Sequence, residues 1–321
     1  MDVFLFEYAT SGAFAELEPS LTVEGMGMFK TLFNGFDKVT TFVDRRISGF
    51  DGIPKVHSYE ELWSHCLEEA DLFLVIAPET DGELYRLTEK AEKSGRQNLG
   101  SNLSAIEVAG DKLATYDALR GLSIPKTVVF DGPTPPLDFP LVAKPRDGVS
   151  CESISLIKSE EELRTVPPGY LLQEYIGGRA ASASLLVGDE TTILSINTQE
   201  IEDFTYRGAK IPLKIEEDCE EIIRAVERIK GLFGYVGVDF ILNDGINIIE
   251  INARPTTPII ALGEVYSVNI SKLILDNYYR ENIPKLKAKR SVLLKKGRRR
   301  NNSFVSFGDY SVWIENESLN F

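Results

Sequence analysis

The chain has 321 residues, of which 43% are apolar and 26% charged, and its formal net charge is −14. This composition predicts a folded protein of two or three domains rather than a disordered chain, and no apolar run approaches the roughly 18 residues that a membrane span needs. The chain begins without the basic region of a signal peptide, and its three Cys and two His residues are too few for a disulfide scaffold, a zinc cluster or a Ser-His-Asp triad. We therefore expect a globular protein of the cytoplasm.

Predicted strands and helices alternate over the first hundred residues. Short apolar runs predict strands, and apolar residues at helical spacing predict the helices between them. Strands separated by helices favour parallel βαβ units, so we predict an α/β domain with a parallel sheet. The strands are expected at 3–6, 39–43 and 72–77, and the helices at 21–33, 59–69 and 83–93.

The remainder of the chain is dominated by short strands, which predicts an α+β architecture. Helices are expected at 112–119 and 216–230. The strands are expected at 127–130, 141–144, 153–157, 170–175, 181–187, 192–196, 235–242 and 246–252.

The end of the chain differs from the rest in charge. Residues 285–321 hold nine basic and three acidic side chains, whereas residues 1–284 have a net charge of −20. A basic tail can bind nucleic acid, but the acidic remainder would repel a phosphate backbone. The alternative is a basic surface that packs on the acidic body, and we expect no nucleic-acid partner.

The predicted hairpin at 235–252 brings two carboxylates together. If Asp244-Gly245 forms a two-residue turn, Asp239 lies opposite Glu250 with Cβ atoms about 4.5–5.5 Å apart, and Asn252 and Arg254 follow on the same face. Like charges in this position destabilise a hairpin unless a cation lies between them, and oxygen ligands suit Mg²⁺. An exposed pair on a solvent face remains the alternative, and a three-residue turn would shift the register.

Two lysines precede or follow predicted elements. Lys144 ends the strand at 141–144 ahead of Pro145, a place where a cation can contact phosphate. Lys112 lies at the start of a predicted helix. Each could equally be an exposed lysine whose stem packs along the surface.

These motifs resemble the ATP-grasp superfamily in their order and spacing, over about residues 104–260. The resemblance implies an N-terminal pre-ATP-grasp domain at 1–104, a small lobe at 105–175, a C-terminal lobe with a metal site at 176–284 and the basic segment at 285–321. The matching motifs are Asp111-Lys112-Leu113, Lys144-Pro145, Gln173-Glu174-Tyr175-Ile176, and the set Asp239, Glu250 and Asn252.

For ATP, the resemblance implies that Lys112 and Lys144 contact the phosphates and that residues 173–176 form the adenine hinge. There the Gln173 side chain and the Glu174 carbonyl would take the adenine amino group, and the N–H of Ile176, which follows Tyr175, would take a ring nitrogen. Residues 146–151 resemble the phosphate-covering loop, although they are poorer in glycine than usual. The acidic residue that usually binds ribose is replaced by Ala180.

For the reaction, the resemblance implies a carboxylate–amine ligase. Such an enzyme transfers phosphate from ATP to a carboxylate, and an amine then attacks the acyl phosphate. Asp239, Glu250 and Asn252 would bind two Mg²⁺ ions, which Mn²⁺ can replace. Arg254 would steady the acyl phosphate, and positioning with charge neutralisation would supply the catalysis, which needs no His.

A narrower resemblance is to an archaeal branch of these ligases that joins the γ-carboxylate of glutamate to tyramine in methanofuran biosynthesis. Another amino acid or amine, or a non-catalytic nucleotide-binding module, remains an alternative. The partners expected are small molecules, with no membrane. The segments that carry this resemblance are 6–12, 23–28, 206–212 and 250–257.

The amine site is expected between two of these segments. Glu7, Tyr8 and Ser11 directly follow the first strand, and ligands of open α/β sheets bind beyond the carboxyl ends of strands. A predicted loop with Tyr206 and Gly208 would approach from the other side. Glu7 would hold the ammonium group of the amine; alternatively it pairs with a basic neighbour, Arg45 or Arg46.

Overall fold

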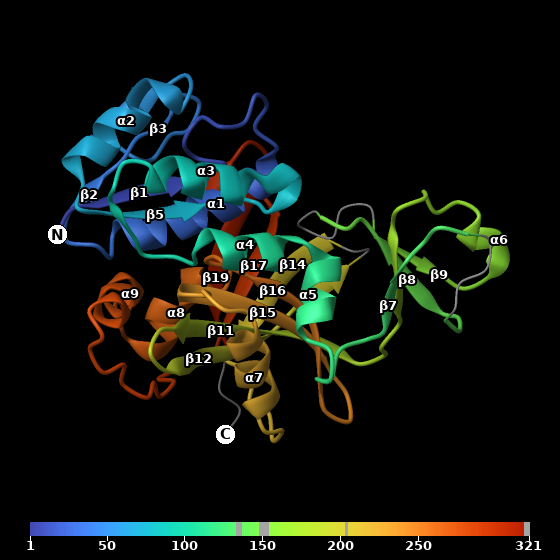
Figure 1. Ribbon diagram of the computed structural model, residues 1–321. Coiled ribbons are helices and arrows are strands. Elements are labelled where there is room, and N and C mark those ends of the chain that lie inside the picture. The colour runs from blue at the N-terminus through green and yellow to red at the C-terminus, as the bar shows by residue number, and fades with distance from the viewer. Residues whose placement is uncertain (133–136, 148–153, 203–204, 318–321) are drawn as a thin grey trace.

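The computed structural model describes residues 1–132, 137–147, 154–202 and 205–317. Figure 1 shows an N-terminal layer above a central sheet, with a smaller lobe that extends to one side. The prediction of α/β and α+β regions is confirmed. No helix within the described part of the chain combines the length and apolarity that crossing a membrane requires.

The N-terminal layer is built on a four-stranded sheet of order β2-β1-β5-β6, whose pairs are all parallel. Both central strands are buried at every residue, which explains their continuous apolar sequence. The predicted strand at 39–43 is wrong as one unit, because it divides into two strands that pair in different sheets. The strands are β1 (Val3–Glu7), β2 (Val39–Thr40), β3 (Val43–Asp44), β4 (Lys55–Val56), β5 (Leu72–Ile76) and β6 (Gln97–Asn98), and the helices α1 (Pro19–Phe33), α2 (Glu60–Glu69), η1 (Thr80–Gly82) and α3 (Glu83–Glu92).

Two short helices lead into the small lobe. The first is not among the predicted elements; its N-terminus is capped by Asn102, whose side chain accepts from the Ala105 N–H at 2.9 Å. The lobe is a four-stranded antiparallel sheet of order β7-β10-β8-β9 with its own small core. Its elements are α4 (Leu103–Gly110), α5 (Lys112–Ala118), β7 (Thr127–Val129), β8 (Leu141–Lys144), β9 (Ser155–Ile157), α6 (Glu160–Leu163) and β10 (Leu171–Glu174). Most of the predicted loop at 146–151 lies outside the described residues.

The central sheet has the order β12-β11-β15-β16 and carries the predicted hairpin. The two-residue turn is wrong: Leu242 pairs with Ile246, so the turn holds three residues. A β-bulge next to Asp239 then shifts the register by one residue and places Asp239 opposite Glu250, as predicted. The elements are β11 (Arg179–Val187), β12 (Thr191–Thr198), α7 (Glu220–Arg228), β15 (Gly234–Leu242) and β16 (Ile246–Asn252).

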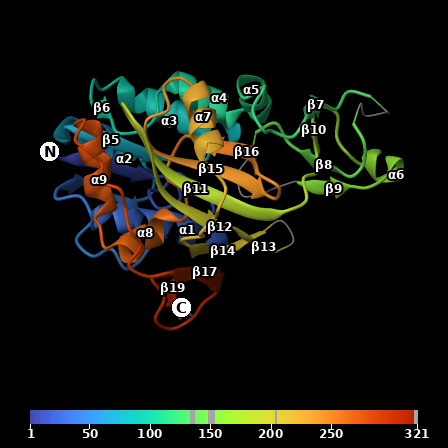
Figure 2. The same ribbon diagram turned by 90° about the horizontal axis from the view of Figure 1, so that it is seen from below.

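Three stretches of the basic segment, within residues 292–316, form strands of a five-stranded antiparallel sheet of order β13-β14-β17-β19-β18. The predicted loop at 206–212 is wrong, because these residues form most of β14, which pairs with β17. Figure 2 shows this sheet on the side of the molecule opposite α4 and α7. The elements are β13 (Glu200–Glu202), β14 (Thr205–Ile211), α8 (Ile259–Tyr266), α9 (Ile270–Tyr278), β17 (Val292–Arg298), β18 (Val305–Phe307) and β19 (Tyr310–Asn316).

Candidate active site

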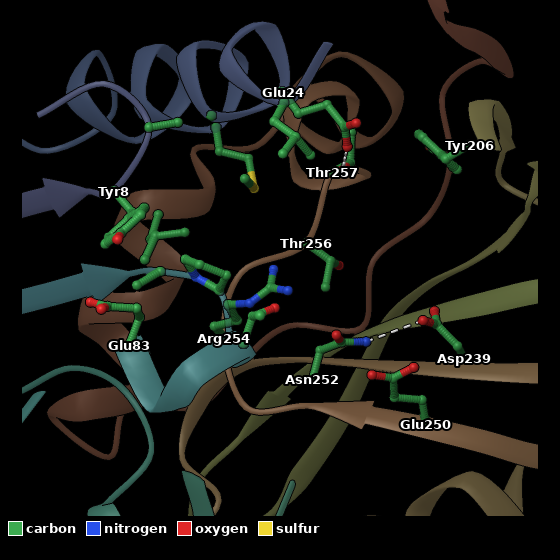
Figure 3. Close-up of a pocket in the computed structure, with 18 of the residues that line it drawn as sticks. Tyr8, Glu24, Glu83, Tyr206, Asp239, Glu250, Asn252, Arg254, Thr256 and Thr257 are labelled. Carbon is green, nitrogen blue, oxygen red and sulfur yellow. Dashed lines mark hydrogen bonds between the residues drawn. The ribbon is translucent and has the colours of Figure 1, made fainter. Parts of the chain in front are cut away.

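A cavity of about 370 Å³ lies where the N-terminal layer meets the central sheet. Its lining comes from the carboxyl end of β1, the first half of α1, the residues after β5, the β15–β16 hairpin and the segment that follows it. Figure 3 shows Tyr8 and Glu83 on one side, Tyr206 and Asp239 on the other, and Arg254 between them. Together with Lys112, Gln199 and Tyr206, residues from separate parts of the chain therefore converge on one space.

The two predicted metal carboxylates lie in this cavity as paired residues of β15 and β16. Asp239 Oδ2 accepts a hydrogen bond from Asn252 Nδ2 at 3.2 Å. Burial, together with the nearby Glu250 carboxylate, raises the pKa of Asp239 to about 7. The pair is thus a site where a cation would be strongly favoured.

Two donors compensate this concentration of negative charge. Gln199 Nε2 donates to Asp239 Oδ1 at 2.8 Å, and Lys112 Nζ lies 3.4 Å from Glu250 Oε1. Lys112, which the sequence assigns to the phosphates of ATP, thus contacts a hairpin acid that the sequence does not name as its partner. Gln199 is not among the predicted residues. It reaches Asp239 because it follows β12, which pairs with β11, and no sequence pattern at position 199 indicates that contact.

A metal site at the hairpin would rest on oxygen ligands only. Among the described residues, no three His, Cys, Asp or Glu side chains gather into a metal cluster. The set Asp239, Glu250 and Asn252 offers two carboxylates and an amide oxygen, which suit hard cations such as Mg²⁺. The raised pKa of Asp239 agrees with a position that is completed by a positive charge.

Arg254 is held at the centre of the cavity by a buried acid. Its Nε and Nη2 both donate to Glu79 Oε2, at 3.0 and 2.8 Å. Glu79 is 7% exposed, and its other oxygen is buried without a hydrogen-bond partner among the described residues. Glu79 is missing from the sequence prediction, although its place just beyond β5, at the carboxyl end of a parallel strand, is a signal that could have identified it.

Glu7 ends β1 and contributes its carboxylate to the cavity wall. Burial raises the pKa of Glu7 to about 7, against the opposing effect of the N–H groups of Ala9 and Thr10, which donate to it at 3.2 and 2.8 Å. A Cβ added at Gly25 of α1 would lie 2.5 Å from Glu7 Oε2, so a glycine is needed there. The alternative that Glu7 pairs with Arg45 or Arg46 is wrong: Arg46 binds Asp44, and Arg45 contacts His57.

A second polar group lies near Tyr206. Thr257 Oγ1 donates to Glu24 Oε2 at 2.6 Å, and Lys296 Nζ forms an ion pair with the other oxygen of Glu24. The ammonium of Lys296 lies 5.9 Å from the centre of the Tyr206 ring. The Tyr206 hydroxyl is buried and has no hydrogen-bond partner among the described residues.

The other predicted site residues do not line the cavity. Lys144 and Gln173 are buried in the small lobe, where Lys144 Nζ donates to Gln173 Oε1 at 2.9 Å, and Glu174, Tyr175 and Ile176 follow at the end of β10. Ser11 and Gly208, which the sequence assigns to the substrate site, face backbone atoms rather than the cavity. Ser11 Oγ donates to the carbonyl of Phe42 at 3.3 Å, and a Cβ at Gly208 would lie 2.1 Å from the carbonyl oxygen of Leu294.

Comparison with known proteins assigns the fold to a family. Residues 109–258 match the model of the ATP-grasp domain, and residues 39–106 match that of the pre ATP-grasp 3 domain. The chain is 38% identical to a protein of the ATP-grasp superfamily from Archaeoglobus fulgidus, with a TM-score of 0.85 over 99% of this chain and 100% of that one. An L-amino acid ligase from Bacillus licheniformis, 18% identical, shares the fold with a TM-score of 0.67 over 95% of this chain and 82% of that one.

Two curated relatives extend over most of the chain. The tyramine–L-glutamate ligase of Methanocaldococcus fervens is 34% identical over 299 residues, which are 88% of this chain and 95% of the relative. The enzyme of the same name from Methanocaldococcus jannaschii is 34% identical over 300 residues, 88% of this chain and 90% of the relative. The chain therefore belongs to the ATP-grasp family, with a pre-ATP-grasp domain in front. It is an ATP-dependent carbon–nitrogen ligase that forms an amide.

Proposed function

We propose that the enzyme joins the γ-carboxylate of L-glutamate to the amino group of tyramine in methanofuran biosynthesis, with release of ADP and phosphate. The observation that carries this proposal is the cavity itself, in which an acidic hairpin, a buried arginine and an apolar wall meet. The 34% identity to two tyramine–L-glutamate ligases over most of the chain supports the choice of substrates.

The proposed first step transfers the γ-phosphoryl group of ATP to the carboxylate, which gives an acyl phosphate and ADP. Arg254 would contact the phosphoryl oxygens, since its guanidinium is fixed by Glu79 and faces the cavity. Lys112 and Lys144 would contact the phosphates of ATP, and residues 173–176 the adenine.

Asp239, Glu250 and Asn252 would hold two Mg²⁺ ions, which Mn²⁺ can replace. When bound, the ions would neutralise charge on the phosphates and orient them. Lys112 and Gln199, which now compensate the two carboxylates, would then turn toward phosphate oxygen or solvent.

In the proposed second step, the amine nitrogen attacks the acyl carbon, the C–O bond to phosphate breaks, and the amine loses a proton. The amine would enter on the side of Glu7 and Tyr8. Here Phe14 packs edge-on against Tyr8 with ring centres 4.8 Å apart, and the apolar lining suits an aromatic ring. The other apolar lining residues on this side of the cavity are Leu21, Met28, Ile76, Ala77 and Pro78.

The test is a single incubation of the enzyme with ATP, Mg²⁺, glutamate and tyramine. The expected product has the mass of the two substrates less one water, appears with ADP and phosphate in equal amounts, and fragments as the γ-amide. A panel of other amino acids and amines is run in parallel. A clear preference for a different pair would overturn the substrate assignment, and ATP binding without any amide product would favour a nucleotide-binding module.

The proposal extends to the organisation of the chain. The domains would be the pre-ATP-grasp domain at 1–104, the small lobe at 105–175, the metal-binding lobe at 176–284 and the C-terminal segment at 285–321. The partners would be ATP, an amino acid and an amine, with neither nucleic acid nor membrane, and the enzyme would act in the cytoplasm, where ATP is available.

A further inference from the structure

Strand β17, which lies beyond residues 109–258 that match the ATP-grasp domain, places one buried lysine next to the cavity. Along β17 the residues with even numbers face inward: Val292 and Leu294 are 0% and 1% exposed, and Lys296 is 7% exposed. A lysine at a core position is costly unless its charge is paired. The carboxylate of Glu24 provides that pairing.

Glu24 belongs to the cavity wall, whereas Lys296 lies behind it. One oxygen of Glu24 binds Lys296, and the other accepts from Thr257 at 2.6 Å. Each carboxylate oxygen has two acceptor positions, so both oxygens keep the capacity to accept from a ligand. The two contacts thus fix the orientation of Glu24 without using up its acceptors.

Thr257 also ties Glu24 to the reaction centre. It lies three residues after Arg254, in the segment that leaves the acidic hairpin. Figure 3 shows Glu24 and Thr257 joined at one edge of the cavity, with Tyr206 beside them and Arg254 and Asn252 farther in. Glu24 and Arg254 therefore line one cavity, and a molecule with two polar ends that fills it would face both.

Tyr206 adds a hydrogen-bonding group to the same edge. Its hydroxyl is buried without a partner among the described residues, and an unsatisfied buried polar group costs free energy that a ligand can recover. Burial raises the pKa of Tyr206 well above its usual range, with the Glu24 carboxylate acting in the same direction. The phenol therefore stays protonated and can donate to a carboxylate or accept from an ammonium group.

We propose that Glu24 and Tyr206 form the recognition site for the backbone end of the amino-acid substrate. Glu24 binds its α-ammonium group, and the Tyr206 hydroxyl binds its α-carboxylate. Lys296 is a positioning residue, which fixes the orientation of the Glu24 carboxylate from β17. This inference rests on the proposed function, because it requires that the substrate be an α-amino acid activated at its side-chain carboxylate. It also moves Tyr206 from the amine side, where the sequence places it, to the amino-acid side.

The test compares glutamate with glutarate, which keeps both carboxylates but lacks the α-ammonium group that Glu24 is proposed to bind. With tyramine and ATP saturating, the ratio of kcat/KM for glutamate over glutarate is measured in the wild type and in Glu24→Gln. Loss of a charged hydrogen bond predicts a fall in this ratio of about 10- to 100-fold in the variant. Tyr206→Phe is expected to raise the KM for glutamate without raising that for tyramine.

Two further variants separate positioning from folding. Lys296→Gln is expected to raise the KM for glutamate more than it lowers kcat, and Lys296→Arg to restore it, which a merely structural lysine would not require. Glu24→Gln combined with Lys296→Gln removes both buried charges, so it tests the ratio if the single variant does not fold. Lys295→Gln is the matched control, because Lys295 is the neighbouring lysine of β17 and pairs with Glu200 instead.

The outcomes distinguish this inference from the proposed function. No amide from glutamate in the wild type overturns the substrate assignment and this inference with it. Product from glutamate with an unchanged ratio in Glu24→Gln and in the double variant overturns the inference alone. A higher KM for tyramine, with that for glutamate unchanged, would assign Glu24 to the amine and equally overturn it.

Discussion

Lys112 and Lys144 are both buried lysines, yet their side chains contact different kinds of partner. Lys112 Nζ lies 3.4 Å from the Glu250 carboxylate at the edge of the cavity. Lys144 Nζ donates to the neutral amide oxygen of Gln173 at 2.9 Å, inside the small lobe. Gln173 Nε2 in turn donates to Thr127 Oγ1 at 2.8 Å, so the lobe contains a short buried chain of hydrogen bonds.

The two lysines show that the hairpin and the small lobe differ in how their polar groups are paired. At the hairpin, Gln199 and the ammonium group of Lys112 now compensate the charges of the two carboxylates. A bound metal ion would take over this compensation from them. In the small lobe, the groups proposed for nucleotide binding satisfy each other, so a nucleotide must exchange these hydrogen bonds for its own. We expect substitutions at the hairpin to affect the chemical step and those in the lobe to affect ATP binding.

The largest effect is expected for Glu250→Gln. The variant keeps the shape of the side chain but removes one of two opposed charges, and loss of a metal ligand commonly costs orders of magnitude in rate. We expect kcat to fall about 1,000-fold with the melting temperature nearly unchanged. Asp244→Asn, in the exposed turn of the same hairpin, is the control. Near wild-type turnover with the usual Mg²⁺ dependence would remove Glu250 from the metal site.

Arg254→Ala is expected to have the next largest effect. The guanidinium is proposed to meet charge that develops during phosphoryl transfer, so kcat should fall about 100-fold while the KM for ATP changes little. Arg254→Lys should recover only part of the rate, because an ammonium cannot reproduce the paired contacts with Glu79. An effect confined to KM would assign Arg254 to binding of the unreacted substrate.

Lys144→Met tests the small lobe. Removing the ammonium while keeping an unbranched stem should raise the KM for ATP about tenfold, and the KM values for the amino acid and the amine should stay as they are. Lys158→Met, at an exposed position just beyond β9, is the control in the same lobe. An equal rise in all three KM values would contradict the separation of the lobe from the cavity.

The sequence predicts the parts of the site that local patterns encode. Asp239 and Glu250 are found opposite each other because alternation and a turn signal confine them to one hairpin. The turn itself is predicted wrongly, since a bulge compensates for the third turn residue and alternation alone does not reveal a bulge. The prediction that Asp239 faces Glu250 is therefore correct only because the extra turn residue and the β-bulge shift the register in opposite directions.

The residues that the sequence does not reveal come from distant elements. Glu79 approaches Arg254 from the other layer, across 175 positions of sequence, and Gln199 reaches Asp239 from β12 and its continuation. The sequence does not reveal Lys296 as a buried residue, because it belongs to a run of basic residues that resembles a solvent-exposed tail. The alternation of Val292, Leu294 and Lys296 is the signal that could have identified β17 as a strand with an inward-facing lysine.

The smallest expected effect on catalysis concerns Glu7, whose role on the amine side can be separated from its effect on stability by pH. Burial raises the pKa of Glu7 from 4.5 to about 7 in the folded protein. A carboxyl group with a raised pKa contributes stability that is present below pH 4.5 and is lost as the pH rises through 7. Glu7→Gln removes this loss, so above pH 8 the variant should be more stable than the wild type by about 3 kcal/mol, and below pH 4.5 the two should agree.

The catalytic contribution of Glu7 should increase as the pH rises, whereas its contribution to stability decreases. If Glu7 holds the ammonium group of the amine, the ionised carboxylate is the active form, so kcat/KM for tyramine in the wild type should fall as the pH drops below 7. Glu7→Gln should raise the KM for tyramine about tenfold at high pH, weaken this pH dependence and leave the KM for ATP unchanged. Stability is followed by chemical denaturation from pH 4 to 9, and KM by initial rates from pH 5.5 to 9. A variant that gains stability at high pH but keeps normal amine kinetics would show that the buried carboxylate of Glu7 does not touch the substrate, and the amine would have to bind elsewhere along the apolar wall.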